Sequence, residues 1–378
     1  MPNHNNKINQ CASVLFAGKR LAGKAAALLA LCLLAWFSPA TAEAGSTTHN
    51  VRVNGDIQAA IDAASNGDTI QLAAGQYDIT TTIDPGGKQV TIIGTVDGNG
   101  DPTSVLDGGN PVGGTSGVRV LICQNGETST TVFQNLVIQN GVAAAGGGMY
   151  NNDSTPTLTN CTFTGNSAKV GGGMCNDDSY PTLTNCTFTV NLAFSDGGGM
   201  YNAAGSSPTL TNCTFTSNSA FEGGGMLNKD SSSPILTNCR FATNTSGRDG
   251  GGMYNRSNSN PTLTGCAFRN NTADDDGGGM YNNGSSPTLA NCSFCGNVDG
   301  SGFNSISGDA INGSSSGNIL LDVACVFGDI NGDGVFNYAD RAAMNIALGV
   351  CDADINGDGE VNGADMAFIL SWWGPCIP

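Results

Sequence analysis

The middle of the chain repeats one pattern of apolar and polar positions every 25 to 27 residues. The copy that begins at Gly146 reads GGGMYNNDSTPTLTNCTFTGN, and an earlier, degenerate copy reads VFQNLVIQN from Val132 to Asn140. A fixed period of this length predicts a repeat architecture with one structural unit per copy. Three apolar residues keep step through six copies: Met149, Met174, Met200, Met226, Met253 and Met280; Leu158, Leu183, Leu210, Leu236, Leu263 and Leu289; Phe163, Phe188, Phe215, Phe241, Phe268 and Phe294.

Each repeat predicts a coil of short β-strands. Its apolar positions alternate over a few residues, and Thr, Asn and Gly leave no stretch of about ten residues that could form a helix. The Leu pattern of leucine-rich repeats, which have a similar period, is missing. We therefore expect coils stacked about 4.8 Å apart, with backbone hydrogen bonds running from coil to coil.

A bend at one asparagine decides which side chains face inward. Strict alternation from Leu158 would send Phe163 to the opposite face, whereas a left-handed bend at Asn160 lets Leu158, Cys161 and Phe163 all point inward. Asn is the residue other than Gly that best tolerates this conformation. The same position holds Asn135, Asn185, Asn212, Asn238, Asn291 and, as the one exception, Gly265, and Gly is the substitute that such a bend requires.

The bend asparagine between two short strands resembles the asparagine ladder of pectate-lyase-like β-helices. The paired signatures Gly-Gly-Gly-Met and Phe-x-x-Asn, the latter first seen from Phe163 to Asn166, resemble the repeats of polymorphic outer membrane proteins. This resemblance covers roughly residues 130 to 300. It implies an all-β fold, a right-handed single-stranded parallel β-helix.

Residues 43–66 are predicted to cap this β-helix, and residues 67–318 to form it. Ile57–Ala64 has the pattern of a short amphipathic helix, followed by the strand-like segment from Gly67 to Leu72. This arrangement is similar to the N-terminal cap of many β-helices, and a cap is needed because the first coil would otherwise expose its core and an unpaired edge. We expect about nine coils in total.

Residues 1–42 have the pattern of a signal peptide. Basic residues precede an apolar run from Ala25 to Phe37, which is too short to span a bilayer, and a small-x-small cleavage pattern ends at Ala42. We therefore expect bacterial-type export to the extracellular space or the cell surface, with no transmembrane segment after cleavage. The cleaved chain keeps 10 Lys and Arg against 31 Asp and Glu, a net charge of −21 that disfavours nucleic acid and anionic membranes as partners.

One cysteine occupies the same position in each repeat: Cys161, Cys186, Cys213, Cys239, Cys266 and Cys292. We interpret these residues as small buried apolar fillers. Neighbouring coils would also bring their Cα atoms within disulfide range, so disulfides between coils and a metal site remain alternatives at this stage.

Four acidic residues precede the glycine triplet in successive repeats: Asp196, Glu222, Asp249 and Asp276, with Val170 at this place in the repeat before. Carboxylates about 5 Å apart repel one another, so either water and salt screen them or a cation binds. A solvated acidic stripe is the simplest interpretation. A calcium-binding stripe and a catalytic or substrate-cation site are the alternatives.

Candidates for catalysis lie at the end of this acidic series. They are Asp275 and Asp276, with Arg248 and Arg269 in nearby repeat register. Polygalacturonase-like β-helices combine several Asp residues with a Gly-His-Gly motif, but His49 is the single His after cleavage, so hydrolysis of that kind is disfavoured. Pectate-lyase-like enzymes need calcium carboxylates and an Arg or Lys base, and Arg240, Arg248, Arg256 or Arg269 could supply the base.

Residues 319–378 contain two twelve-residue loops with the spacing of calcium ligands. They begin at Asp329 and Asp354, repeat at 25 residues, and place Gly334 and Gly359 where such a loop must turn sharply. An Asp at position 12 and a helix-like segment only after each loop resemble dockerin. The predicted Ca²⁺ ligands are Asp329, Asn331, Asp333, Val335, Asn337, Asp340, Asp354, Asn356, Asp358, Glu360, Asn362 and Asp365.

Two functions follow from this organisation. The favoured one is a binding protein whose β-helix contacts polysaccharide or another surface and whose dockerin-like end binds a cohesin-like or cell-envelope partner; regular coils without long loops argue against a catalytic cleft. The alternative is a carbohydrate-active enzyme, a calcium-dependent polysaccharide lyase or a glycoside hydrolase, in polysaccharide breakdown. Calcium loops that merely cap the solenoid are the plainer interpretation of the C-terminal region.

Overall fold

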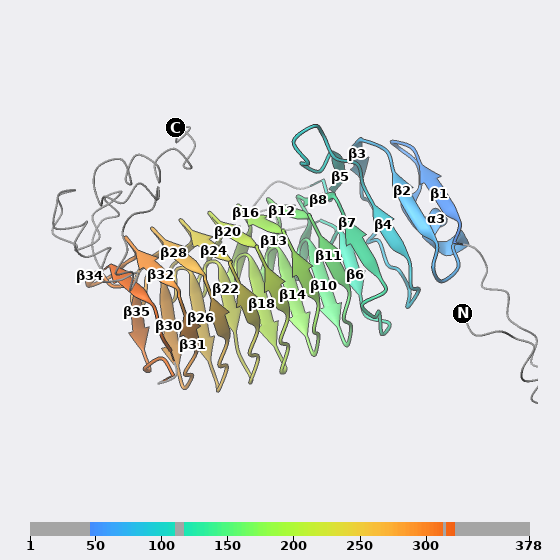
Figure 1. The fold of residues 1–378 in the computed structure, drawn as a ribbon. Coiled ribbons are helices and arrows are strands. Elements are labelled where there is room, and N and C mark those ends of the chain that lie inside the picture. The colour runs from blue at the N-terminus through green and yellow to red at the C-terminus, as the bar shows by residue number, and fades with distance from the viewer. Residues whose placement is uncertain (1–45, 110–116, 313–314, 322–378) are drawn as a thin grey trace, which may run out of the picture. The chain divides into compact units, whose positions relative to one another are not determined.

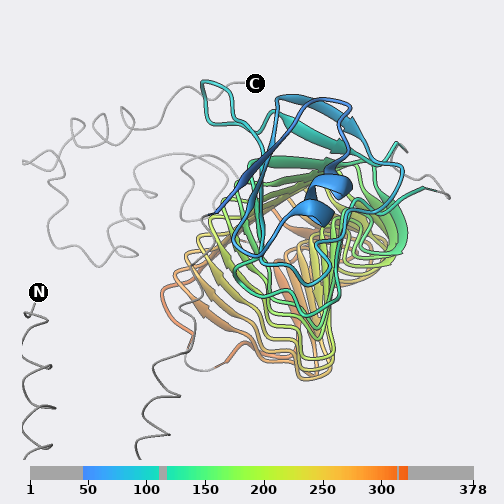
Figure 2. The same cartoon turned by 90° about the vertical axis from the view of Figure 1, so that its right-hand side faces the viewer.

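The repeats form a parallel β-helix of about nine coils, as the sequence predicts. The computed structural model describes residues 46–109, 117–312 and 315–321, and these residues wind as a stack of coils (Figure 1). Figure 2, a quarter turn away, shows successive coils overlying one another. Four sheets run along the stack, and we call them A, B, C and D in the order in which each coil passes through them.

The sheets are built from three- to five-residue strands, with two-residue strands toward the C-terminal end of sheet C. Sheet A contains β1 (Thr48–Val51), β2 (Thr69–Leu72), β4 (Thr91–Ile93), β7 (Val132–Gln134), β11 (Thr157–Thr159), β15 (Thr182–Thr184), β19 (Thr209–Thr211), β23 (Ile235–Thr237), β27 (Thr262–Thr264) and β31 (Thr288–Ala290). Sheet B contains β3 (Gly75–Asp78), β5 (Ser104–Asp107), β8 (Leu136–Gln139), β12 (Thr162–Thr164), β16 (Thr187–Thr189), β20 (Thr214–Thr216), β24 (Arg240–Ala242), β28 (Ala267–Arg269), β32 (Ser293–Cys295) and β36 (Ile319–Leu321).

The other two sheets have eight strands each. Sheet C contains β9 (Val142–Ala145), β13 (Ser167–Val170), β17 (Leu192–Asp196), β21 (Ser219–Ala220), β25 (Thr245–Ser246), β29 (Thr272–Ala273), β33 (Val298–Asp299) and β34 (Gly302–Phe303), which is antiparallel to β33. Sheet D contains β6 (Leu121–Cys123), β10 (Met149–Asn152), β14 (Met174–Asp177), β18 (Met200–Ala203), β22 (Met226–Asn228), β26 (Met253–Arg256), β30 (Met280–Asn283) and β35 (Ile306–Gly308).

The predicted asparagine bend joins sheets A and B. Asn160 has a φ of 51° and Gly265 a φ of 64°, and the other five predicted positions are left-handed as well. Leu158, Cys161 and Phe163 are consequently all fully buried, as expected. The bend therefore lets each coil send both of its strands' apolar residues into one core.

The core consists of columns of identical side chains. The rings from Phe163 to Phe294 stack with centroids 4.5 to 4.7 Å apart and planes 2 to 3° from parallel. Burying one such ring contributes about 1.5 to 3 kcal/mol. The cysteine column behaves as the filler interpretation predicts, because all six of its thiols are free and buried. Hydrogen bonding to the neighbouring thiols, with burial, raises the pKa of Cys213 and Cys239 to about 12, so these residues stay in the thiol form.

The asparagine of each Phe-x-x-Asn signature satisfies the backbone at the turn between sheets B and C. The side chain of Asn191 is fully enclosed; its Nδ2 donates to the Phe163 carbonyl at 3.0 Å and to Asn218 Oδ1 at 2.9 Å. Its backbone N–H donates to the same Asn218 oxygen at 3.1 Å. A second buried ladder in sheet D joins Asn151, Asn176, Asn202, Asn228, Asn255 and Asn282 at 2.8 to 3.0 Å.

The N-terminal end contains helix α3 (Ile57–Ala63), where the sequence predicts a helix. Asp56 accepts a hydrogen bond from the Ala59 N–H at 2.9 Å, and Ile57 and Ile61 are buried in the core of the stack. His49, which the sequence places outside the coils, instead lies on β1, the first strand of sheet A, 3.1 Å from Asp68. Backbone N–H groups of Ser65 and Thr47, together with His49, lower the pKa of Asp68 to about 2.

The left-handed bend predicts the effect of substitutions at Asn212, whose φ is 54°. Replacing Asn212 with Ala should lower the free energy of unfolding by about 1 kcal/mol, because a Cβ without a compensating polar group disfavours this conformation. Asn212→Gly should lower it less. Urea-induced unfolding measures both, with Thr211→Ala on the adjacent strand as the control. Equal losses for Asn212→Ala and Thr211→Ala would contradict the role assigned to the bend.

Candidate functional site

Sheets C and D meet at a sharp bend made by the glycine triplets. The first glycine of each triplet has a positive φ, 65° at Gly197, and a Cβ there would lie 2.3 Å from the Met200 carbonyl oxygen. The second and third glycines press against carbonyls of the next coil; a Cβ on Gly198 would lie 2.4 Å from the Gly224 oxygen. The triplet therefore folds the chain back tightly enough for the outer faces of two sheets to meet.

A second apolar cluster fills the angle between these outer faces. It is formed by the residue that follows the buried Met in each repeat, a set that we call the outer row of sheet D. The outer row comprises Tyr150, Cys175, Tyr201, Leu227, Tyr254 and Tyr281. Simple strand alternation would leave these side chains exposed, yet Leu227 is fully buried and Tyr254 is 3% exposed. Ala145 and Val170 of sheet C pack against the cluster, so it joins the two sheets.

Ion pairs between buried carboxylates and partly exposed arginines cover the outer row. Arg256 lies over the Tyr254 ring at 5.5 Å and contacts Asp196 at 3.0 Å and Glu222 at 2.6 Å. Arg248 contacts the other oxygen of Glu222 at 2.7 Å and Asp249 at 3.5 Å. We call these five charged residues the ion-pair network. It spans consecutive coils of sheets C and D.

The network overturns the interpretation of the acidic residues as a solvated stripe. Asp196, Glu222 and Asp249 are 8%, 5% and 4% exposed, and arginines neutralise them; only Asp276 is exposed. The alternation pattern could not show this, because Arg248 lies in the bend after β25 of sheet C whereas Arg256 ends β26 of sheet D. Nor does the part of the chain that the structure describes place three or more acidic, His or Cys side chains so that they could share a metal ion.

The pKa directions follow from this packing. Burial raises the pKa of Asp249, against the pull of Arg248. Burial works against the charge of Arg256, but Asp196 and Glu222 raise its pKa on balance. Asp249 and Glu222 likewise raise the pKa of Arg248. Both arginines are therefore held protonated, which makes them poor general bases.

Three of the four catalytic candidates meet in one open pocket of about 510 Å³. Arg248, Asp275 and Asp276 line it, and Arg248 lies 3.9 Å from Asp275. Arg269 is not part of this pocket; it is exposed on β28 of sheet B. The remaining lining residues are Asp249, Asp274, Tyr281 and Gly300. The pocket thus continues the ion-pair network toward the C-terminal coils.

Two phenylalanines lie exposed beside the network. Phe194 is 56% exposed on β17, two residues before Asp196, and Phe221 is 51% exposed immediately before Glu222. Asp196 and Glu222 form a parallel bridge, so the two rings belong to neighbouring coils of sheet C. The sequence did contain this signal, since Phe stands there where another repeat has Lys169, but the predictions above do not include it.

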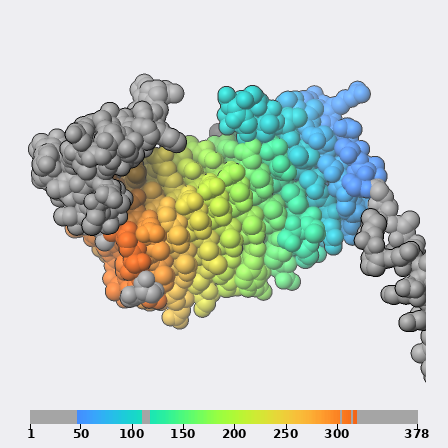
Figure 3. Space-filling model, viewed as in Figure 1, coloured from blue at the N-terminus to red at the C-terminus, as the bar shows by residue number. Residues whose placement is uncertain are grey.

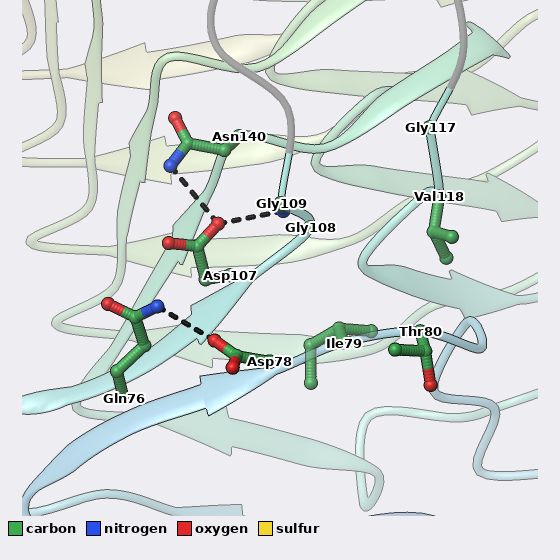
Figure 4. Close-up of a pocket in the computed structure, with 10 residues that line it drawn as sticks. All are labelled: Gln76, Asp78, Ile79, Thr80, Asp107, Gly108, Gly109, Gly117, Val118 and Asn140. Atoms are coloured by element: carbon green, nitrogen blue, oxygen red, sulfur yellow. Dashed lines mark hydrogen bonds between the residues drawn. The ribbon is translucent and has the colours of Figure 1, made fainter.

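A second pocket, of about 600 Å³, lies in the N-terminal coils (Figure 4). Asp78 and Asp107 sit in register on β3 and β5. Asp107 accepts hydrogen bonds from the Gly109 N–H at 2.8 Å, Asn140 at 3.1 Å and Gln139 at 2.8 Å. Its carboxylate is therefore engaged in holding the chain after β5.

One comparison with known proteins, the match to a family model, bears on the fold. The family model described as a right-handed β-helix region matches residues 110–247, and this match indicates that the solenoid winds in the right-handed direction. No curated protein matches the chain. Among the described residues, no helix is long and apolar enough to cross a membrane. The predicted Ca²⁺ ligands from Asp329 to Asp365 lie outside the described residues.

Solved structures with related architecture are distant. Pectate lyase Pel9A is 15% identical with a TM-score of 0.46, over 75% of this chain and 82% of that one. An alginate lyase from Paenibacillus sp. str. FPU-7 is 12% identical with a TM-score of 0.27, over 70% and 99%. ORF18 of Geobacillus virus E2 is 11% identical with a TM-score of 0.33, over 82% and 66%. Likenesses this remote do not bear on what the chain binds.

The ion-pair network predicts a large loss of stability when Arg256 is removed. Arg256→Ala leaves the buried Asp196 without its arginine and removes one of the two arginines that contact Glu222, which should lower the free energy of unfolding by about 3 kcal/mol. The exposed Arg240 on sheet B provides the control, and Arg240→Ala should change stability by less than about 0.5 kcal/mol. Denaturant unfolding monitored by circular dichroism compares the two. A loss for Arg256→Ala no larger than the control's would contradict the network.

Proposed function

We propose that the β-helix binds polysaccharide on the outer face of sheet C, along Phe194, Phe221 and the pocket that contains Arg248 and Tyr281. The observation that carries this proposal is the pair of half-exposed phenylalanines on neighbouring coils. Isolated exposed apolar residues are common, but two adjacent aromatic rings on a rigid sheet provide a platform on which the C–H face of a sugar ring can stack.

The surroundings of the rings suit a glycan chain. The pocket near Tyr281 offers carboxylates and a guanidinium that can hydrogen-bond sugar hydroxyls. The phenylalanines and the pocket lie on successive coils, so a linear polymer could contact both at once. The acidic character of the whole chain, with a formal charge of −17, favours a neutral glycan over a polyanionic one.

The lyase alternative receives less support from this geometry. A lyase needs a catalytic base that is unprotonated near neutral pH. Neighbouring carboxylates raise the pKa values of Arg248 and Arg256, so both arginines stay protonated. Arg269 stands on a different sheet from the pocket. We therefore propose binding without turnover as the function of this surface.

The ends of the β-helix complete the proposal. Helix α3 would cap the first coil, with Ile57 and Ile61 covering the core. The dockerin-like region would bind two Ca²⁺ ions through the loops that begin at Asp329 and Asp354 and attach the secreted protein to a cohesin-like or cell-envelope partner. The protein would then hold a polysaccharide at the cell surface or within an extracellular complex.

Glycan binding should depend on both exposed rings. In affinity electrophoresis against a panel of neutral and uronate polysaccharides, the double variant Phe194→Ala/Phe221→Ala should bind its best glycan at least about tenfold more weakly, equivalent to about 1.4 kcal/mol. Val190→Ala, which removes another half-exposed apolar side chain in the same repeat, is the matched control. Equal affinities for the wild type and the double variant would refute the assigned surface, and release of unsaturated products from any uronate would favour a lyase.

Calcium binding can be tested separately on the full chain. Isothermal titration calorimetry should detect two Ca²⁺ sites in the wild type, one in Asp329→Ala, and none in Asp329→Ala/Asp354→Ala, because each substitution removes the first ligand of one loop. Asp153→Ala, in a turn of the β-helix, should keep both sites. Failure of the wild type to bind calcium would defeat the dockerin-like assignment and leave the glycan proposal intact.

A further inference from the structure

The outer face of sheet A is a regular, uncharged lattice. Ten strands stack in continuous register, and the outward residues form two straight rows along the helix axis. The first row is β-branched throughout: Thr48, Thr69, Thr91, Val132, Thr157, Thr182, Thr209, Ile235, Thr262 and Thr288. The second row includes five consecutive threonines: Thr159, Thr184, Thr211, Thr237 and Thr264.

The spacing of this lattice is set by the core beneath it. Phenylalanine rings on successive coils lie 4.5 to 4.7 Å apart, which gives the repeat along the axis. Two residues along a strand separate the rows by roughly 6.7 Å. The left-handed bends and the full burial of Leu158, Leu183 and Leu210 hold the strands in place. The face is therefore a rigid, nearly rectangular net of methyl and hydroxyl groups.

The hydroxyl groups of this net are open to an external partner. Thr157 Oγ1 donates to the Ser129 carbonyl at 2.9 Å, but Thr184, Thr211, Thr237 and Thr264 make no side-chain hydrogen bond with any described residue. Buried or structural hydroxyls would be bonded within the protein. The side chains that form the core point the other way, so contacts with the core do not require hydroxyl groups at these positions.

The absence of charge narrows the class of partner. The chain carries 31 acidic residues, yet none of the outward side chains of the sheet A strands, as the structure describes them, is charged. Sheet B carries outward threonines on β12, β16 and β20, but Arg240 and Arg269 interrupt its rows on β24 and β28. A charged partner surface would find no opposite charge on sheet A. An uncharged periodic partner surface could instead hydrogen-bond to the hydroxyl groups and exclude water from the methyl groups.

We propose that the outer face of sheet A binds ice. The prism faces of ice present a rectangular net of water oxygens whose two repeats are similar to the two spacings of this face. The threonine methyl groups would hold water in an ordered net, and the hydroxyls would anchor that net to the protein, so that it merges with the ice lattice. This function is independent of glycan binding, which uses sheet C on another side of each coil.

The decisive comparison places the same charge on two faces of the same two coils. Thr184→Lys/Thr211→Lys puts two ammonium groups in the centre of the sheet A net, while Thr189→Lys/Thr216→Lys puts them on sheet B. The full-length protein should shape growing ice crystals into facets and depress their growth temperature below the melting point. The sheet A variant should lose both effects, and the sheet B variant should keep them.

Other outcomes would overturn the proposal. One such outcome is that ice grown with the wild type forms round discs, with no gap between the melting and growth temperatures. Another is that both lysine variants lose ice activity equally while their thermal unfolding temperatures are equal. Binding of the wild type to crystalline cellulose or chitin powder that only Thr184→Lys/Thr211→Lys abolishes, without any effect on ice, would assign the face to a glycan surface. Phe194→Ala/Phe221→Ala should retain full ice activity, which separates failure here from failure of the glycan proposal.

Discussion

The whole structure depends on satisfying the backbone polar groups of coils whose parallel strands bond to neighbouring coils. Each strand bonds to the coils before and after it, and most turns continue this backbone pairing, but at the turn between sheets B and C some N–H and C=O groups need side-chain partners. Buried asparagines supply them: Asn191 Nδ2 reaches one coil back to the Phe163 carbonyl, while its N–H and Nδ2 reach one coil forward to Asn218. This arrangement works only if every coil has nearly the same length, which explains a repeat of 25 to 27 residues. Figure 3 shows the successive coils packed against one another on the face in view.

Much of this fold could be predicted because its requirements are local. A left-handed bend selects Asn or Gly, and a column position between stacked coils selects one residue size, so the bends at Asn160 and Gly265 and the columns of Leu, Cys, Phe and Met were all recognisable in the sequence. The role of the Phe-x-x-Asn asparagine was less accessible. Its side chain bonds to carbonyls 28 to 30 residues earlier, a contact that no local pattern indicates.

The candidate site was predictable in its residues but not in its arrangement. Asp196, Glu222 and Asp249 stand out as a series, and a series of carboxylates on a strand implies a solvated stripe. The angle at the glycine triplets determines their environment, because it turns sheet D against sheet C. Arg256 thereby contacts Asp196, which is 60 residues away in the sequence. The same angle buries the outer row of sheet D, where alternation predicts exposure. Burial here is a property of two sheets together, so a period of two along one strand could not reveal it. Arg269 shows the complementary case: repeat register suggests that it lies near Arg248, but the coil places it on sheet B while Arg248 lies in the bend after sheet C.

The outward-facing positions show which residues of the repeat are not determined by folding alone. On sheet A the outward residues stay threonine or another uncharged residue through all ten strands, whereas on sheets C and D the outward positions change from coil to coil. No neighbouring repeat has an arginine at the position of Arg248 or of Arg256, and these two residues lie with Glu222, Phe194 and Phe221 on three successive coils. Packing against the core requires neither the uniformity of one face nor the variety of the other, because both concern side chains that point away from it. A rigid solenoid of identical coils can therefore present two unrelated surfaces, one periodic and one irregular, without any change in the fold that supports them.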